Sequence, residues 1–234
     1  MPGYGAEMQK LSRRLPPVAA KTEPTGRLSA SRRLNLAIGL PLRNREALNT
    51  LIQQLYDPSS PNYRHYLSPE QFGEMFGATE SDYQAVVAFA KANGLTVIKT
   101  HPNRLVLDVQ GSVADVERVM HVTMREYPHP GEERNFYAPD VEPSLDLTVP
   151  ILEISGLNNY AYRQSKLHWL SGNAIPKSGS GPSGSLIGKD FRTAYLPGVT
   201  NLTGAGQMVG LVQFDGYYTN DIKTYITTAG ISTS

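Results

Sequence analysis

The residue types that carry out catalysis are present in this sequence, but they form no catalytic pattern. No Gly-x-Ser-x-Gly segment places a serine at a strand-to-helix turn, as a hydrolase nucleophile requires. There is no cysteine to serve as a thiolate nucleophile or a metal ligand. The histidines lack the spacing of a metal site, so turn or surface roles are favoured for them. They are His65, His101, His121, His129 and His168.

Three other patterns could suggest functional groups, and each has a simpler explanation. The glycines of 204–206, with Gly210, look like part of a dinucleotide-binding motif. However, they precede a predicted strand, whereas phosphate binding needs them after the strand, at a helix N-terminus. Asp215 follows that strand, where α/β enzymes place functional groups, but a turn-capping Asp-Gly is the favoured interpretation. Glu132 and Glu133 lie in a charged loop and are interpreted as a solvated rim. We predict no catalytic, cofactor-binding or metal site in this chain.

The composition is that of a folded protein with a net charge close to zero. Of the 234 residues, 40% are hydrophobic and 18% are charged, which is enough for a real core. The net charge of +1 gives no field to attract nucleic acid or an anionic membrane. No stretch approaches the roughly 20 apolar residues that span a bilayer. Residues 1–9 lack the apolar run of a secretory signal. We therefore expect no nucleic-acid or membrane partner, and no signal peptide is visible.

From residue 33 onward, the hydrophobic pattern predicts strands and helices in a defined order. Leu34, Leu36 and Ile38 alternate with polar or small residues, which indicates a half-buried strand. Capping residues at Ser68 and Thr79 begin two of the helices that follow. The order then predicts an α+β fold: a ferredoxin-like (split βαβ) antiparallel sheet with helices on one face. The later elements are helices 44–55, 69–76 and 79–94, strands 95–100 and 105–110, helix 112–120 and strand 122–126.

The second part of the chain has a different character. Residues 171–185 are rich in Gly, Ser and Pro, which predicts a flexible linker. Short helices are expected over 189–195 and 219–229, with a nearly continuous apolar strand over 208–214, of the kind found inside a parallel sheet. A lone strand and helix cannot bury both faces, so this is an incomplete α/β fragment. We predict a mobile tail (1–28), a folded domain (29–165), a linker (166–185) and this fragment (186–234).

Three motifs occur in order within the folded domain. Residues 56–72 are YDPSSPNYRHYLSPEQF. Residues 102–109 are PNRLVLDV, with GSV at 111–113, and residues 136–139 are FYAP. Together they closely resemble the propeptide of the sedolisins (serine-carboxyl peptidases, peptidase family S53), known as the pro-kumamolisin activation domain. The resemblance covers roughly residues 33–160.

The second part resembles the beginning of the sedolisin catalytic domain, through GKDFRTAY at 188–195, LTGAGQ at 202–207 and FDGY at 214–217. The resemblance implies a fragment of a subtilisin-like α/β domain. In the family, the nucleophilic Ser, its Glu and Asp partners and a calcium site lie at positions downstream of Ser234, so none carries over. We expect this chain to be inactive alone and to hold no cofactor, with calcium expected in the full-length family member.

The resemblance implies that the folded domain is an intramolecular chaperone and a temporary inhibitor of its cognate peptidase catalytic domain, in a secreted protein. The stretch after Tyr160 would cross the substrate cleft, and cleavage in the linker would release the inhibitor. We hypothesise that carboxylates such as Asp108, Glu132 and Glu133 lose favourable contacts in acid. The predicted maturation cleavage region comprises Leu170, Ser171, Gly172, Asn173, Ser178, Gly179, Ser180 and Gly181.

Two alternatives of other classes remain. A free-standing protease inhibitor or interaction module could use the same fold, although the linker and the unfinished strand favour a precursor. A ferredoxin-like RNA binder would need an aromatic-basic strand motif, which the sequence lacks.

Overall fold

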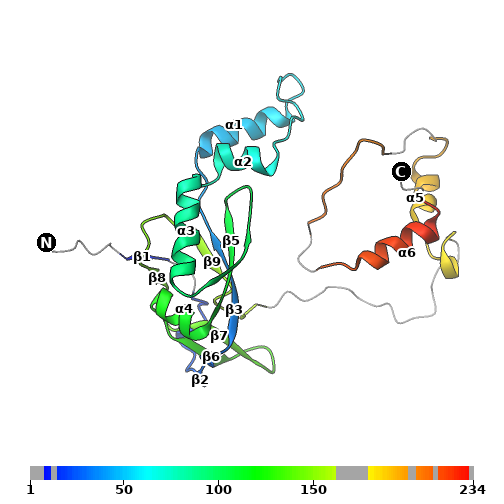
Figure 1. Ribbon diagram of the computed structural model, residues 1–234. Helices are drawn as coiled ribbons and strands as arrows, with labels where there is room; N and C mark the ends of the chain where they lie inside the picture. Colours follow the sequence, from blue (N-terminus) through cyan, green and yellow to red (C-terminus); the bar gives the residue numbers. More distant parts are fainter. Residues whose placement is uncertain (1–7, 12–14, 162–178, 200–203, 213–215, 232–234) are drawn as a thin grey trace. The chain divides into compact units, whose positions relative to one another are not determined.

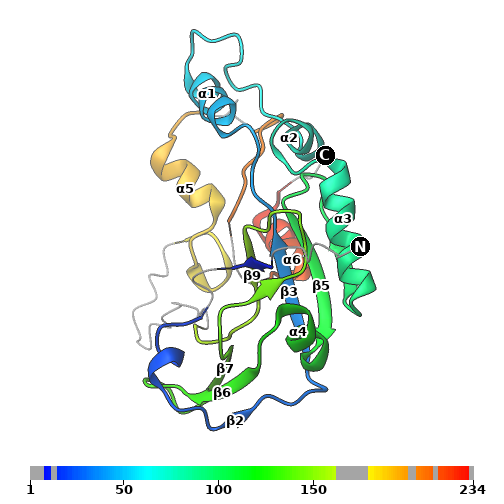
Figure 2. The ribbon, with the colours of Figure 1, turned by 90° about the vertical axis from the view of Figure 1, so that its left-hand side faces the viewer.

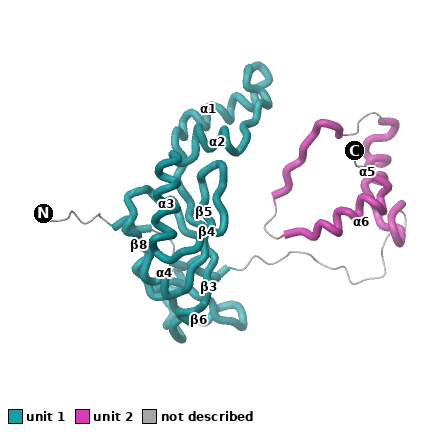
Figure 3. The backbone as a smooth tube through the Cα atoms, viewed as in Figure 1, with its two compact units in different colours: residues 1–162 teal, residues 163–234 magenta. Residues whose placement is uncertain are grey.

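The computed structural model describes residues 8–11, 15–161, 179–199, 204–212 and 216–231. The chain divides into two compact units, residues 1–162 and 163–234 (Figure 3). Each unit is described by itself.

The first unit is organised by a four-stranded sheet. Its strands are β3 (Arg33–Gly39), β4 (Thr96–Thr100), β5 (Val106–Ser112) and β9 (Glu153–Ser155), in the order β4-β5-β3-β9. All neighbours pair antiparallel. The longest pairing, between β3 and β5, runs over seven residues of each strand and places Ile38 opposite Leu107. The chain is therefore an α+β protein, as the sequence predicted.

Two helices cover one face of this sheet. The helices α3 (Glu80–Ala92) and α4 (Val113–Met120) lie on one side of the strands in Figure 1, and that side faces the viewer in Figure 2. Strand alternation points every second residue at the helices, so the predicted inner residues are buried. The helices contribute residues at helical spacing. The buried set includes Leu34, Leu36, Ile38, Leu107, Val109, Val86, Ala90, Val116 and Met120.

The predicted helix starts are confirmed by their capping contacts. The helix α2 (Pro69–Phe76) begins with a complete capping box at Ser68 and Gln71. The hydroxyls of Thr79 and Ser112 accept the backbone N–H groups of the third helical residues of α3 and α4, each at 3.1 Å. Gly94 follows α3 in the left-handed conformation, with φ of 79°.

The helix α1 (Arg45–Tyr56) differs from the other helices of the first unit because none of its residues is buried. Asn44, an amide residue at the start of the predicted helix 44–55, makes no side-chain capping hydrogen bond, and its amide instead donates to the carbonyl of Met75 at 2.9 Å. Asn44 itself is left-handed, with φ of 50°. The asparagine therefore ties α1 to α2 rather than capping α1.

A second, three-stranded sheet has the order β2-β6-β7, formed by β2 (Gly26–Arg27), β6 (Met124–Pro128) and β7 (Asn135–Pro139). The prediction that the strand near 122–126 completes the first sheet is wrong, because β9 takes that edge. The physical reason is local. The Met124 N–H donates to the Glu117 carboxylate at 2.8 Å, and the short turn after β6 brings β7 alongside it.

The described part of the predicted mobile tail is packed against the unit. The strand β1 (Gln9–Lys10) pairs with β8 (Ser144–Leu145), and Leu11 belongs to the main core. A 3₁₀ turn at Ala19–Lys21 places Ala19 in a second, smaller core. The apolar residues of this stretch follow neither helical nor strand spacing, so hydrophobic periodicity does not reveal them.

In the second unit, the predicted short helices are confirmed as α5 (Gly188–Tyr195) and α6 (Thr219–Ala229), preceded by a 3₁₀ turn at Pro182–Gly184. The predicted strand over 208–214 is not formed over 208–212, where Met208 is 97% and Val212 is 90% exposed. Residues 213–214 lie outside the described part. A buried strand needs neighbours to pair with, and the described residues of this unit supply none.

No helix in the described ranges has both the length and the apolar content to cross a membrane.

Truncation of a side chain at the centre of the main core should strongly lower the stability of the first unit. We expect Leu107→Ala to lower the free energy of unfolding by about 2–5 kcal/mol, because Leu107 is fully buried and the cavity cannot be refilled. Urea unfolding followed by circular dichroism measures this change. The matched control is Ile98→Ala on neighbouring β4, where the side chain is 59% exposed and the change should stay within about 0.5 kcal/mol. Equal effects of the two variants would contradict the assigned core.

Candidate functional site

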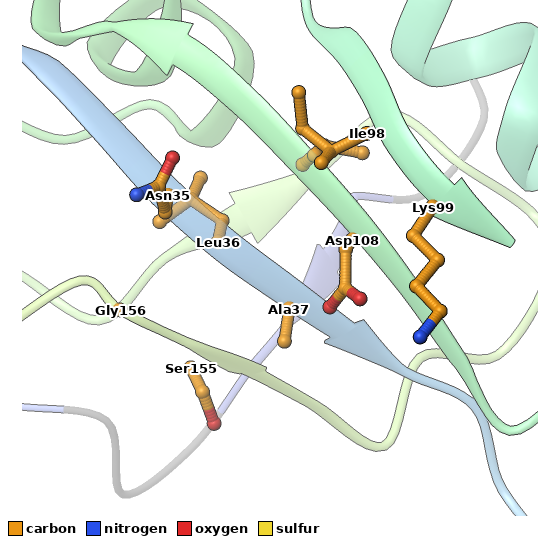
Figure 4. A pocket seen from close by; sticks show the side chains of 9 residues that line it. Asn35, Leu36, Ala37, Ile98, Lys99, Asp108, Ser155 and Gly156 are labelled. Carbon is orange, nitrogen blue, oxygen red and sulfur yellow. The ribbon is translucent and has the colours of Figure 1, made fainter. Parts of the chain in front are cut away.

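Within the described residues of the first unit, no helix covers the second face of the first sheet, and this face is the candidate functional site. The residues between the core positions point away from α3 and α4, among them Asn35, Ala37 and Asp108. With Ile98 and Ser155 they line a shallow depression of about 360 Å³ (Figure 4). Most of these side chains are small or polar, so the face suits contact with another surface better than enclosure of a small ligand.

Cross-strand hydrogen bonds hold the polar side chains of this face in place. The Arg33 Nε donates to Gln110 Oε1 at 2.9 Å, and the Gln110 amide donates to Asn35 Oδ1 at 2.8 Å. In the lining of the depression, Gly156 has φ of 96° and packs so tightly on the Asn35 carbonyl that a Cβ could not be accommodated. These contacts order the polar side chains and the backbone of this face.

One titratable pair lies at the rim of the open face. His101 Nε2 and Asp108 Oδ2 are 2.9 Å apart, and both side chains are partly exposed. The His101 backbone N–H donates to the Tyr83 hydroxyl at 3.1 Å, and that hydroxyl donates to the Val106 carbonyl at 2.8 Å. Burial raises the pKa of Tyr83, so the phenol stays protonated as a structural donor. The pair joins the turn after β4 to β5.

The motif at 102–109 has a structural explanation at Arg104. This residue is nearly buried, has φ of 53° and donates through Nε to the Ala78 carbonyl at 2.8 Å. Its Nη1 contacts Glu74 at 2.7 Å and Glu80 at 3.3 Å, and the guanidinium lowers the pKa of Glu74. Arg104 thus joins the β4–β5 turn to α2 and α3.

The two glutamates predicted to form a solvated rim differ from each other. Glu132 Oε2 pairs with Arg134 Nε at 2.5 Å, and this pairing lowers the pKa of Glu132. Glu133 is exposed. The loop between β6 and β7 is therefore partly ordered by charge, which the sequence interpretation missed.

The residues predicted for the cleavage region are only partly described. Leu170, Ser171, Gly172, Asn173 and Ser178 lie outside the described residues. The other three, Gly179, Ser180 and Gly181, lie in a turn held by backbone hydrogen bonds from Gly179 to Gly184 and from Gly181 to Ser185, each at 2.9 Å.

The carboxylate of Asp190 fixes this turn to the start of α5. It accepts the backbone N–H groups of Ser180 at 3.0 Å and Ile187 at 2.8 Å. These hydrogen bonds lower the pKa of Asp190, which therefore remains ionised. Asp215 and His168, the other residues considered from the sequence, lie outside the described residues.

The described histidines do not converge on a common site. His121 pairs with Asp146 at 3.1 Å, whereas His101 pairs with Asp108 on the open face. Within the described ranges, no group of three His, Asp or Glu side chains could hold a metal ion.

Comparison with known proteins places this geometry in a family. Residues 20–160 match the family model described as "Pro-kumamolisin, activation domain". Xanthomonalisin of Xanthomonas sp. (strain T-22) is 27% identical over 222 residues, covering 88% of this chain and 26% of that protein. Sedolisin of Pseudomonas sp. (strain 101) is 25% identical over 198 residues, covering 85% of this chain and 34% of that protein.

Kumamolisin of Bacillus sp. (strain MN-32) is 23% identical over 212 residues, covering 88% of this chain and 38% of that protein. The chain thus spans between about a quarter and two fifths of the length of these relatives. Since the family model covers more than half of its residues, the chain belongs to the pro-kumamolisin activation domain family, the propeptides of sedolisin-type S53 peptidases.

Proposed function

We propose that the first unit, within residues 29–165, is an intramolecular chaperone and a temporary inhibitor that docks on its cognate peptidase domain through the open face. The proposed architecture is ferredoxin-like. It is supported by the antiparallel order β4-β5-β3-β9, with two helices on one face.

One observation carries this proposal: among its described residues, the first unit has a complete core and yet leaves one sheet face uncovered. Both core clusters of the first unit are built from its own described residues, so it can fold without a partner. A parallel-sheet peptidase makes many non-local contacts and folds slowly. A rigid, preformed sheet face that binds the nascent peptidase would lower the barrier between the unfolded and the native peptidase. The bound unit would then inhibit the folded peptidase.

The exposed apolar residues of the second unit support a peptidase domain as the partner of the first unit. In its described part only Ile187 is buried, while Met208, Val209, Leu211 and Val212 are exposed. Such an apolar run needs a partner sheet, and this favours residues 186–234 as the opening part of a subtilisin-like peptidase domain. The alternative, a free-standing inhibitor or interaction module, does not explain why these apolar residues are present.

Maturation by cleavage within 166–185 completes the proposal. The candidate region is Leu170, Ser171, Gly172, Asn173, Ser178, Gly179, Ser180 and Gly181. Secretion and a calcium site in the peptidase domain are further expectations for the longer protein. No described residues of this chain form a group suited to calcium.

The first test is inhibition. We expect the purified 234-residue chain to act as a slow-binding inhibitor of at least one of mature xanthomonalisin, sedolisin and kumamolisin, because it carries the docking face and the segment after Tyr160. Progress curves with a fluorogenic peptide measure the inhibition, and mass spectrometry detects cleavage within 166–185. Inhibition without any cleavage would support the free-standing inhibitor, and no inhibition of all three would contradict both proposals.

The second test locates the docking surface. We expect Ile98→Asp to weaken inhibition about tenfold or more, since it places a charge in the apolar part of the open face that a partner would cover. The matched control is Ala88→Asp on the exposed side of α3, which lies in the opposite layer and should leave inhibition unchanged. Equal inhibition by both variants, with unchanged thermal midpoints, would place the interface elsewhere.

Acid should lower the stability of the first unit. The folded pKa values of Glu74 and Glu132 lie below their ordinary value of 4.5, owing to Arg104 and Arg134. Each carboxylate thus contributes stability above about pH 4.5 that is lost as pH falls through its lower folded value. We expect the urea midpoint to drop between about pH 5 and about pH 3.

The matched variants of this acid test are Glu132→Gln and Glu133→Gln. The first removes the pair with Arg134 and should flatten the pH dependence, whereas the second alters an exposed neighbour and should leave it unchanged. A midpoint that does not change with pH in the unaltered chain would contradict this assignment.

A further inference from the structure

The point at which the chain leaves the first unit is held by an unusual number of contacts. Asn159 lies beside β7 and exchanges two hydrogen bonds with Tyr137: its Oδ1 accepts the Tyr137 N–H at 2.6 Å, and its own N–H donates to the Tyr137 carbonyl at 3.2 Å. The last residues of the unit therefore continue the edge of the second sheet.

Arg134 fixes the backbone at the same place. Its Nη1 donates to the Asn159 carbonyl at 3.1 Å and its Nη2 donates to the Tyr160 carbonyl at 2.6 Å. The remaining edge of the guanidinium is oriented by Glu132, which accepts from Nε at 2.5 Å. This planar fork holds two successive carbonyls, and a lysine has no equivalent geometry.

The Tyr160 ring is held as well. It stacks on His129 with ring centroids 4.8 Å apart and an interplanar angle of 27°. It meets Phe136 edge-on at 5.1 Å. His129 is fixed in turn, because its Nδ1 accepts the Gly131 N–H at 3.2 Å. Tyr160 thus packs on the second core through a ring that cannot easily rotate.

Together, His129, Glu132, Arg134, Asn159 and Tyr160 form what we call the exit clamp. Segments that leave a domain are usually poorly ordered, because they make too few contacts to offset the conformational entropy lost on ordering. Here both the backbone and the side chain are immobilised just before the residues that lead to the proposed cleavage region. The Tyr160 ring packs against the second core, and the arginine fork fixes in addition the backbone of the two residues at the exit.

We propose that Arg134 is a positioning residue for inhibition and maturation: by fixing Asn159 and Tyr160, it sets where the following segment starts and so presents one register of that segment to the peptidase cleft. This inference rests on the proposed function. A segment tethered at a fixed point reaches its site at a higher effective concentration than one tethered through a longer, loose stretch. Release of the clamp would free Asn159 and Tyr160, so the tether would become longer and several registers would be permitted.

The test compares Arg134→Lys with Arg118→Lys in the 234-residue chain. Arg118 is a matched control because its Nη2 also donates to a carbonyl, that of Asn93 at 2.8 Å, and to a carboxylate, that of Asp115 at 3.0 Å, away from the exit. Each chain is incubated with mature xanthomonalisin, sedolisin and kumamolisin. Inhibition constants, the cleavage sites within 166–185 and thermal midpoints are then measured.

We expect Arg134→Lys to raise the inhibition constant about tenfold and to spread cleavage over several bonds, at a thermal midpoint similar to that of Arg118→Lys. A purely structural arginine would lower the midpoint and leave the cleavage pattern unchanged. The same inhibition constant and cleavage pattern in both variants would overturn the inference while leaving the proposed function intact. If the unaltered chain inhibits none of the three, the proposed function fails. In that case the cleavage pattern still tests the inference about Arg134. If Arg134→Lys leaves the pattern unchanged, or if no cleavage occurs within 166–185, the inference is overturned.

Discussion

The pairing of β3 with β5 is the constraint on which the rest of the structure depends. Because side chains alternate along each strand, one register places Leu36 and Ile38 beside Val109 and Leu107 on a single face. A slip of one residue would turn this apolar set towards solvent. The fixed register forces α3 and α4 onto one side, and it leaves Asp108 and its polar neighbours on the other. The core and the candidate docking face are therefore two consequences of the same pairing.

The second sheet depends on one buried carboxylate. Glu117 on α4 accepts the Met124 N–H at 2.8 Å and pairs with Arg27 of β2 at 2.6 Å. A buried carboxylate needs such partners, since an unpaired one would be strongly destabilising. The three elements that it joins bring β2 and β6 together, and β7 follows through the adjacent turn. This explains why β6, the strand directly after α4, joins the second sheet, whereas the first sheet takes β9 at that edge.

Much of the first sheet could be predicted from the sequence, because Leu34, Leu36 and Ile38 show a clear period and Ser68, Thr79 and Ser112 are strong caps. The open face could also have been identified as the alternate residues of the same strands. The partner of β6 and the place of β9 could not be predicted, since both depend on contacts of Glu117 and on strands of two or three residues. The contacts of Arg134 with Asn159 and Tyr160 were missed because a hydrogen bond to a distant carbonyl leaves no pattern in sequence. The motif at 102–109 identified the family, although its Arg104 serves the fold.

The two units differ in what their own residues can bury, and this asymmetry bears on function. The first unit covers its apolar residues in two cores, whereas the described residues of the second expose nearly all of theirs. Hydrophobic burial is the main favourable term in folding, so the first unit can reach its native state before the second has anything to pack against. A folding assistant requires that order of events. An element that folded only together with its client could not serve as a preformed surface for it. The complete core and the uncovered face are thus the physical conditions for a propeptide to act before the enzyme it serves.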